Sequence, residues 1–280
     1  MKTFVKVFGV IIFVLILAAS SVYWVYVRPF MVKMKQTTTI KYDKELTIVI
    51  GGGGNSGILT SDSLVIVIDT KMDNAADDLY KMVKDIAGNK PILVLNTHIH
   101  PDHTNGNKNY KGQTILAGGN YTAEQWKKEN GEETMPTKWL KDKMIIPMGD
   151  DTLTVLNLEK TIHTGSDIVV FLHRRKMLFS GDVILNKQAP ALFGNANPDG
   201  YIEAMDWLPK QFDIQKIVPG HGEIGGMEVI TSFRQYFIDM KTAAANGDKE
   251  DELVEKYKDW NQVPHVMSPG ATINFIRDMN

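Results

Sequence analysis

The sequence predicts an α/β protein, and three observations in the first hundred residues carry this prediction. Short runs of β-branched residues occupy 45–70 and are interrupted by a glycine turn. A segment with helical spacing of apolar residues follows at 74–88, and a continuous apolar run comes next at 91–97. Because a strand, a helix and a buried strand in this order form a βαβ unit, we expect a parallel pair of strands covered by a helix.

The composition is that of a globular protein and excludes several kinds of function. Of the 280 residues, 43% are hydrophobic and 23% are charged, which is ordinary for a folded domain. The formal net charge of -2 provides no basic surface for nucleic acid, so we expect no nucleic-acid partner. The sequence has no cysteine, so any metal ion must be bound through nitrogen and oxygen atoms.

The N-terminus differs from the rest and predicts a signal anchor or a signal peptide. Residues 7–27 carry no charge and would span roughly 30 Å as a helix, which is enough to cross a bilayer. Tyr23, Trp24 and Tyr26 lie near one end, where aromatic residues meet a membrane interface. Small residues at 18–21 fit cleavage instead. We therefore expect the rest of the chain to lie outside the cytoplasm, either membrane-anchored or secreted or periplasmic.

The chain divides into the N-terminal segment 1–28, a polar tether at 29–43 and one folded domain at 44–280. In this domain Asn74 is a candidate N-cap of the first helix, and Gly88 follows the end of that helix. Polar residues 119–147 either cover a site or connect elements, and 173–176 predict a solvated hairpin turn. Further strand patterns occupy 151–162, 167–173, 176–182 and 214–222, and further helical patterns occupy 201–212 and 227–260.

Three of the seven histidines lie in one hexapeptide, HIHPDH, directly after the apolar run. His98 and His100 are two residues apart, so an extended backbone points both side chains the same way. Pro101 prevents a simple continuation of the strand, and a tight loop would turn Asp102 and His103 toward a neighbouring point. Ligands bind at the carboxyl ends of strands in α/β sheets. Imidazole and carboxylate groups suit zinc, and they also suit iron or manganese.

Three more candidate ligands occur at later strand ends. His163 lies in TIHTGSD, Asp182 in LFSGD and His221 in VPGHG. Each has a glycine nearby, where the backbone can approach closely because glycine has no Cβ. If these side chains reach the hexapeptide, the cluster has enough ligands for two metal ions.

The HIHPDH hexapeptide resembles the H-x-H-x-D-H motif of the metallo-β-lactamase fold superfamily. The resemblance extends over residues 44–225 through five features in order, namely VIVIDT, THIHPDH, IHTGSD, FSGD and VPGHG. It implies an αββα sandwich, with the metal ions at one edge between the ends of two sheets.

The resemblance also implies two groups of metal ligands and two Zn²⁺ ions per chain, with iron or manganese as alternatives. The first ion would be held by His98, His100 and His163. The second would be held by Asp102, His103 and His221. Asp182 would bridge both ions. Asp69, which ends VIVID, would support a ligand without binding metal, or would simply be a turn residue at a strand end.

The complete ligand set resembles that of glyoxalase II-like thioesterases, lactonases and related hydrolases. The absence of cysteine excludes the branch with a cysteine ligand, and Asp182 argues against a lactamase branch that lacks it. The implied function is a dinuclear hydrolase in which a metal-bound hydroxide attacks an ester, lactone, thioester or lactam carbonyl. Asp102 would be the catalytic residue that orients the hydroxide and moves its proton. A β-lactamase proper and an iron-dependent dioxygenase or other redox enzyme are the alternatives.

The loop 186–201 follows Asp182 and is a candidate wall of the substrate pocket. Phe193 and Asn195 are the expected contacts with a small-molecule substrate, and an ordinary connecting loop is the alternative.

Overall fold

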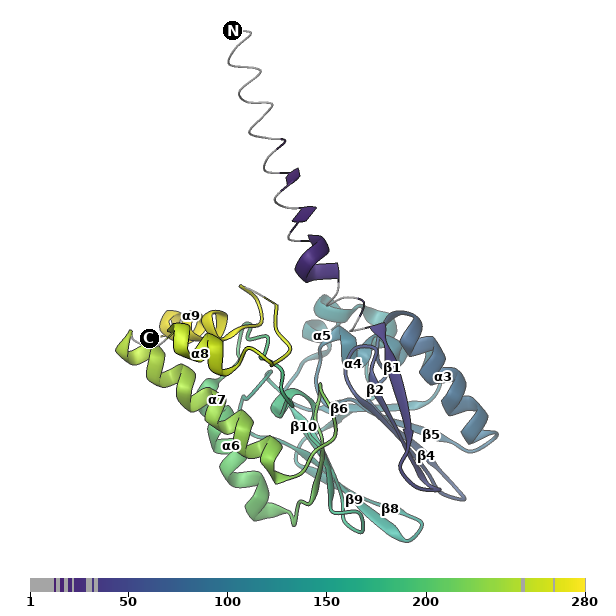
Figure 1. Cartoon of the computed structure of the whole chain (residues 1–280). Helices are drawn as coiled ribbons and strands as arrows, with labels where there is room; N and C mark the ends of the chain where they lie inside the picture. Colours follow the sequence, from purple (N-terminus) through teal and green to yellow (C-terminus); the bar gives the residue numbers. More distant parts are fainter. Residues whose placement is uncertain are drawn as a thin grey trace.

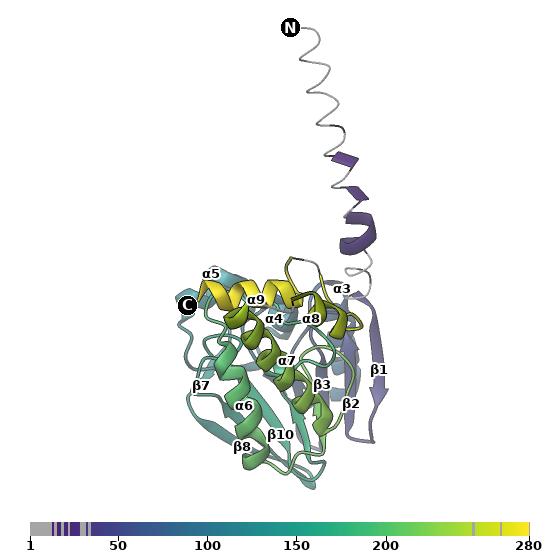
Figure 2. The same ribbon diagram turned by 60° about the vertical axis from the view of Figure 1, so that its left-hand side comes forward.

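Two β-sheets face each other in this protein, and helices cover both outer faces (Figures 1 and 2). The computed structural model describes residues 13, 16–17, 20–21, 23–28, 32, 35–247, 250–263 and 265–279. Within these residues the strands form one sheet of seven, in the order β1 to β7, and one of five, in the order β12-β11-β10-β9-β8. The expected αββα arrangement of layers is therefore present.

The seven-stranded sheet is antiparallel from β1 to β4 and parallel from β4 to β7. Its strands are β1 (Thr37–Lys41), β2 (Leu46–Gly51), β3 (Ser56–Thr60), β4 (Val65–Ile68), β5 (Ile92–Leu95), β6 (Thr114–Gly118) and β7 (Lys138–Leu140). Helix α3 (Asp73–Ala87) joins the parallel strands β4 and β5, as the predicted βαβ unit requires. The short helices of this half are α4 (Pro101–Thr104), η2 (Asn105–Tyr110), α5 (Ala123–Asn130) and η3 (Glu132–Thr134).

The five-stranded sheet is antiparallel except for its last pair, β11 and β12. Its strands are β8 (Lys143–Met148), β9 (Asp151–Asn157), β10 (Ile168–Leu172), β11 (Met177–Phe179) and β12 (Lys216–Val218). Its helices are η4 (Gly181–Val183), α6 (Pro198–Gln211), α7 (Met227–Asn246), α8 (Glu250–Lys256) and α9 (Pro269–Asp278). Figure 2 shows α6 and α7 lying across the outer face of this sheet.

Side-chain alternation along the strands explains the layers. On β4, Val65 and Val67 join the apolar cluster under α3, whereas Ile66 and Ile68 join the cluster between the two sheets. Both faces of β4 are buried, which is why its sequence is continuously apolar. A third cluster packs the outer face of the five-stranded sheet against α6, α7 and α9.

Two expectations about helix α3 have different outcomes. Gly88 directly follows the helix with a φ of 56°, and its N–H donates to Lys84. The prediction that Asn74 is the N-cap is wrong, because the helix begins at Asp73 and Asn74 already lies in its first turn. Met72 occupies the N-cap position, and its side chain makes no capping hydrogen bond.

The segment 119–147 both connects the sheets and covers part of the hexapeptide. Trp126 of α5 is fully buried in a small cluster with Ile99, and Asn130 donates a hydrogen bond to the carbonyl of Ile99. The predicted continuous helical tail at 227–260 is interrupted, because Gly247 ends α7 with a φ of 70°.

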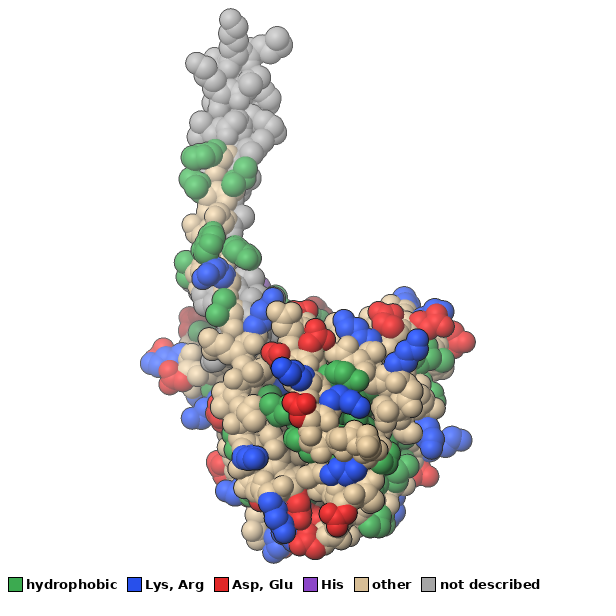
Figure 3. Space-filling model, turned by 90° about the vertical axis from the view of Figure 1, so that its right-hand side faces the viewer, with side chains coloured by type: hydrophobic (Ala, Val, Ile, Leu, Met, Phe, Trp, Pro, Cys, Tyr) green, Lys and Arg blue, Asp and Glu red, His purple; other side chains and the backbone are tan. Residues whose placement is uncertain are grey.

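The predicted N-terminal anchor or signal peptide, residues 7–27, lies mostly outside the described residues. Among the residues that are described, no helix is both long and apolar enough to span a bilayer. The segment predicted as a tether, 29–43, contains β1, which pairs with β2 along its whole length. On the face of the molecule in Figure 3, basic and acidic side chains are interspersed.

The hairpin turn between β10 and β11 is present, but its predicted solvation is wrong for Arg175. The Arg175 side chain is only 5% exposed and contacts three carboxylates. Its guanidinium donates to Asp43 at 2.8 Å, to Glu45 at 2.8 Å and to Asp151 at 2.6 Å. Asp43 and Glu45 lie between β1 and β2, whereas Asp151 begins β9. Arg175 therefore connects the two sheets at the end of the sandwich away from the strand ends described below.

We expect Arg175→Met to lower the free energy of unfolding by about 3 kcal/mol, because it leaves the buried Asp151 carboxylate without its cation. Chemical denaturation measures this change. Arg234→Met is the matched control, because Arg234 pairs with Asp206 at the surface and such exposed pairs contribute less than about 1 kcal/mol.

The effect of Arg175→Met should also depend on pH. Burial alone would raise the pKa of Asp43, but hydrogen bonds from Arg175 and from the backbone of Glu45 and Leu46 lower that pKa below its usual value. The resulting stabilisation is complete above the unfolded-state pKa of about 3.9 and is lost as the pH falls through the folded-state pKa. The difference between wild type and variant should therefore shrink below about pH 4, and an undiminished difference there would contradict this account.

Candidate metal centre

The seven predicted ligands come together at one edge of the sandwich, where strands of both sheets end. His98, His100 and α4 follow β5 of the seven-stranded sheet. Asp182 follows β11 and His221 follows β12 of the five-stranded sheet, while His163 lies between β9 and β10. Strand ends that are far apart in the sequence thus place the seven side chains in one region, where they could hold metal ions.

These side chains form two groups, each compact enough to hold one metal ion. The ligand atoms of each group all lie within 4.8 Å of one another. The first group is His98, His100, His163 and Asp182. The second group is Asp102, His103 and His221. The histidines and Asp102 are divided as the sequence resemblance implies, and Asp182 falls in the first group.

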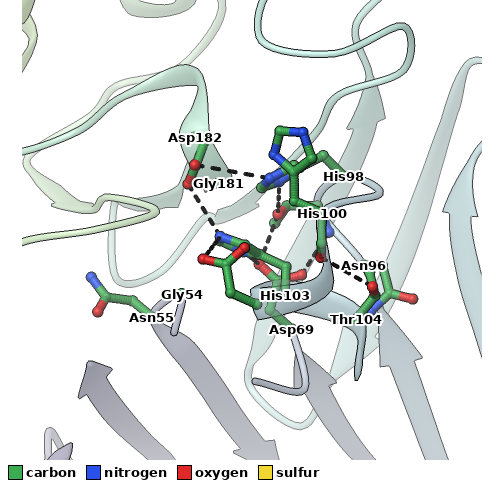
Figure 4. A network of polar contacts seen from close by, with 12 residues as sticks. Gly54, Asn55, Asp69, Asn96, His98, His100, His103, Thr104, Gly181 and Asp182 are labelled. Carbon is green, nitrogen blue, oxygen red and sulfur yellow. Dashed lines mark hydrogen bonds and ion pairs between the residues drawn. The ribbon is translucent and has the colours of Figure 1, made fainter. Parts of the chain in front are cut away.

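Asp182 lies between the two groups and presents one carboxylate oxygen to each (Figure 4). Its Oδ2 is 3.4 Å from His163 Nε2 and 3.9 Å from His98 Nε2. Its Oδ1 is 3.2 Å from His103 Nε2 and 3.6 Å from His221 Nε2. This is the arrangement that a carboxylate bridging two cations needs.

Two buried atoms in the described part of the site indicate that its residues fit a cation. His98 Nε2 and Asp182 Oδ1 are both buried and lack a hydrogen-bond partner. A buried polar atom without a partner is costly unless something else satisfies it, and both atoms carry lone pairs suited to a metal ion. Imidazole nitrogens and carboxylate oxygens are the donor set that zinc accepts.

The electrostatics of the two groups also suit metal binding. Burial lowers the pKa of His98, and it lowers that of His163 to about 3, so both imidazoles are neutral and can donate a lone pair. Burial alone would raise the pKa of Asp102 and Asp182, but the neighbouring His103 and His221 lower both below the usual range. The imidazoles of the first group are therefore neutral. In the second group burial alone would lower the pKa of His103 and His221, but Asp102 and Asp182 raise both above the usual value, so a bound cation would take the place of protons on these two imidazoles.

The chain approaches Asp182 closely because residue 220 is glycine. A Cβ on Gly220 would lie 1.9 Å from Asp182 Oδ1, so any larger residue would displace this carboxylate. Pro101 occupies the first position of α4. Proline is well tolerated there because a backbone N–H at this position would have no partner within the helix. β5 already ends at Leu95, and α4 turns Asp102 and His103 toward His221.

Asp69 supports His103 from behind. Its Oδ2 lies 2.7 Å from His103 Nδ1, and its two oxygens accept hydrogen bonds from the backbone and hydroxyl of Thr97. Asp69 is 1% exposed and has a φ of 57°, so it lies in the left-handed region. By accepting the Nδ1 proton it leaves His103 Nε2 free for a metal ion. This contact is the one that the predicted supporting role of Asp69 requires.

Tyr201 holds His163 in the same way, and no sequence pattern indicates this contact. The Tyr201 hydroxyl is 2.7 Å from His163 Nδ1, and the tyrosine is fully buried on α6, stacked on Phe237. Burial raises the pKa of this phenol, so it stays protonated. Its oxygen can accept the Nδ1 proton and leave His163 Nε2 for metal. A tyrosine on the apolar side of a helix looks in the sequence like any core residue.

Asp167 is a second residue whose role only the structure reveals. Its carboxylate accepts hydrogen bonds from the backbone of His163 and from the backbone and hydroxyl of Thr164. These bonds fix the HTGSD turn that presents His163. Burial raises the pKa of Asp167 to about 6.

The predicted pocket residues Phe193 and Asn195 are both exposed, Phe193 to 57%. A cavity of about 460 Å³ borders His221, and the beginning of the loop 186–201 lines it. The lining residues from that loop are Asn186, Lys187 and Gln188. The loop therefore does reach a cavity beside the site, although the contacts of Phe193 and Asn195 with substrate stay a prediction.

We expect Tyr201→Phe to weaken metal binding at the first group by on the order of tenfold, because His163 loses the partner that orients it. Competition with a chromophoric chelator measures the affinity. Tyr236→Phe is the matched control, because Tyr236 is equally buried in the same aromatic cluster but its hydroxyl binds Thr272. Equal losses in the two variants would show that Tyr201 has only a packing role.

Comparisons with known proteins agree with this fold. A profile of the Metallo-beta-lactamase superfamily matches residues 49–221. "Acyl-coenzyme A thioesterase MBLAC2" from Gallus gallus is 26% identical over 171 residues, which are 51% of this chain and 61% of that relative. "Metallo-beta-lactamase type 2" from Bacillus cereus is 29% identical over 173 residues, which are 59% of this chain and 65% of that relative.

A solved structure, "Metallo-beta-lactamase from Pontibacter korlensis", superposes with a TM-score of 0.64 at 19% sequence identity. The match covers 73% of this chain and 100% of that one, and at this identity it shows the fold. The family profile covers more than half of the chain, from the middle of β2 to His221. The chain therefore belongs to the metallo-beta-lactamase superfamily.

Proposed function

We propose that this protein is a dinuclear zinc hydrolase that cleaves an ester, lactone, thioester or lactam carbonyl. The observation that carries the proposal is the position of Asp182, which directs one oxygen to each of two compact ligand groups. Its homologues in the superfamily are metal-dependent hydrolases, among them a thioesterase and β-lactamases. The ligand set contains only nitrogen and oxygen donors, and it also accommodates iron or manganese.

The exposure of the ligands indicates the side from which a substrate approaches. The side chains of His98, His103 and His163 are at most 2% exposed. Asp102 and His221 are 21% and 12% exposed, and His100 of the first group is also partly exposed, so both groups face the open side of the site. A carbonyl group that enters beside the cavity bordering His221 would meet the second group.

Two metal ions, when bound, would polarise the substrate oxygen and lower the pKa of a water molecule. His98, His100 and His163 would hold one ion, Asp102, His103 and His221 the other, and Asp182 both. Asp102 is the most exposed of the carboxylates in the site, and its Oδ2 lies 3.1 Å from His221 Nε2. It is placed to orient a water molecule against the carbonyl carbon and to pass the water proton to the leaving group.

A β-lactamase proper is the second candidate. The relative from Bacillus cereus favours it, at a slightly higher identity than the thioesterase relative. An iron-dependent dioxygenase or other redox enzyme on the same fold is a third candidate. The identity of the bound metal distinguishes it from the two hydrolases.

We also propose that the domain lies outside the cytoplasm, anchored to the membrane or released. The uncharged run at 7–27 supports this localisation. Fractionation of cells that express the full chain, followed by protease treatment of cells in which only the cytoplasmic membrane is intact, tests it: protection of the domain from protease under these conditions would contradict the proposal.

The first test of the function is the metal content of the protein purified without added metal. We expect close to two zinc ions per chain and hydrolysis of thioesters or lactones that a chelator abolishes and zinc restores. If the kcat/KM for β-lactams is higher than that for thioesters and lactones, the protein is a β-lactamase proper. Bound iron with oxygen consumption would overturn the hydrolase proposal.

We expect His100→Ala to reduce the metal content toward one ion per chain and to remove most of the activity, because it deletes a ligand of the first group. Elemental analysis and kcat/KM measure the two effects. His173→Ala is the control, because His173 is exposed on the β10–β11 turn and lies outside both groups. A His100→Ala protein with full metal content and rate would remove His100 from the site.

A further inference from the structure

Lys71 is a buried lysine whose entire hydrogen-bonding capacity is directed at β2 and the turn that follows it. It is 0% exposed, and its Nζ donates to the carbonyls of Val49, Gly51 and Gly54. The distances to Val49 and Gly54 are 2.9 and 2.7 Å. An ammonium group has three donors, so these three acceptors use all of them. A lysine buried to this extent is unusual and needs a reason.

Two of the three acceptors, Gly51 and Gly54, belong to the glycine turn between β2 and β3, which we define as residues 51–54, and the third, Val49, lies in β2. Gly51, Gly52 and Gly53 have φ values of 77°, 69° and 96°, all in the left-handed region that favours glycine. In this conformation the carbonyls of Gly51 and Gly54 both point at the Lys71 ammonium. Glycine makes the turn possible, but glycine alone does not make it rigid, since it has the largest conformational freedom to lose.

The glycine turn packs directly on two ligands of the second group, Asp102 and His103. Gly54 N–H donates to the carbonyl of Asp102 at 3.0 Å. A Cβ on Gly54 would lie 2.1 Å from the His103 ring, and one on Gly53 would lie 2.6 Å from the Asp102 carbonyl oxygen. Figure 4 shows Gly54 beside His103. The backbone of the turn is therefore the surface against which these two side chains are held.

The residue that follows the turn reaches the third ligand of the second group. Asn55 N–H donates to the carbonyl of Gly220 at 2.8 Å, and the Asn55 amide donates to Pro219 and Gly222, both at 2.8 Å. These three bonds enclose His221 on both sides. The turn and Asn55 together thus contact Asp102, His103 and the loop of His221.

The charge on Lys71 matters for this arrangement. Burial lowers its pKa to about 7, while Asp69 and Asp102 nearby favour the charged form. Three carbonyl acceptors can be satisfied only by the three donors of the ammonium, because a neutral amine has two. Removal of this group would leave buried carbonyls without a partner and allow the turn to move.

We propose that Lys71 is a positioning residue for the second metal ion: it fixes the glycine turn against which Asp102, His103 and the His221 loop are packed. The inference rests on the proposed dinuclear function and extends it to a residue that touches neither metal nor substrate. Lys71 acts on the second group because the glycine turn contacts Asp102 and His103. The first group is held instead by Tyr201 and the HTGSD turn.

The test compares zinc binding by full-length wild type and Lys71→Met, which keeps the length and removes the donors. Titration of the metal-free proteins against a chromophoric chelator yields both zinc affinities, and His100→Ala and His221→Ala assign each binding step to a ligand group. We expect Lys71→Met to bind the first ion as wild type does and the second on the order of 10–100-fold more weakly.

Lys90→Met is the matched control, because Lys90 also donates to a turn, at Thr60 and Ser61 between β3 and β4. Lys71→Gln retains an amide donor, so its second affinity should fall between those of wild type and Lys71→Met. It also provides the measurement if Lys71→Met does not fold.

Unchanged affinities in the Lys71 variants, or equal weakening of both ions, would overturn the positioning role. Weakening of the second ion by Lys90→Met to the same degree would do so as well. A wild-type protein that binds only one zinc ion would instead overturn the dinuclear function itself, and with it this inference.

Discussion

The carboxylate of Asp182 is the contact on which the geometry of the site depends. It comes from the five-stranded sheet, whereas four of the side chains around it come from the hexapeptide at the edge of the seven-stranded sheet. The apolar cluster between the sheets fixes their separation, and Gly220 lets the backbone approach Asp182 without a clash. Packing of the sandwich therefore sets the distance between the two ligand groups, because a shift of either sheet would move Asp182 relative to one of them.

Each half of the site is supported by different chemistry. In the first half a neutral phenol, Tyr201, and the Asp167-bonded turn hold His163. In the second half a carboxylate, Asp69, holds His103, and an ammonium, Lys71, holds the glycine turn beside it. Both halves contain a charged supporting group, Asp167 in the first and Asp69 with Lys71 in the second. Both also contain partly exposed side chains, so the two halves differ in the groups that hold them rather than in burial.

The role of a residue can be predicted from the sequence when it depends on neighbours in the sequence. It is much harder to predict when the partners of the residue are distant in the sequence. The hexapeptide, the βαβ unit and the glycine-flanked ligands follow from local patterns and strand ends, and the resemblance orders them into two groups. The partner of Tyr201 lies 38 residues away in the sequence. The partners of Lys71 lie 17 to 22 residues away, and those of Arg175 lie 24 to 132 residues away. The residue types of Tyr201, Lys71 and Arg175 are ordinary for a core helix, a strand end and a surface turn. Only the tertiary fold gives each of them its partner, so Arg175 was wrongly predicted to be solvated and Tyr201 was missed.

The cavity beside His221 connects substrate contact to metal binding. Its walls include Asn55 and Asn186, and the amides of both donate to carbonyls of residues 219–223. The polar character of these walls is therefore partly structural, because the amides hold the loop that presents His221. A substrate group in this cavity would touch the same loop that positions a ligand of the second ion.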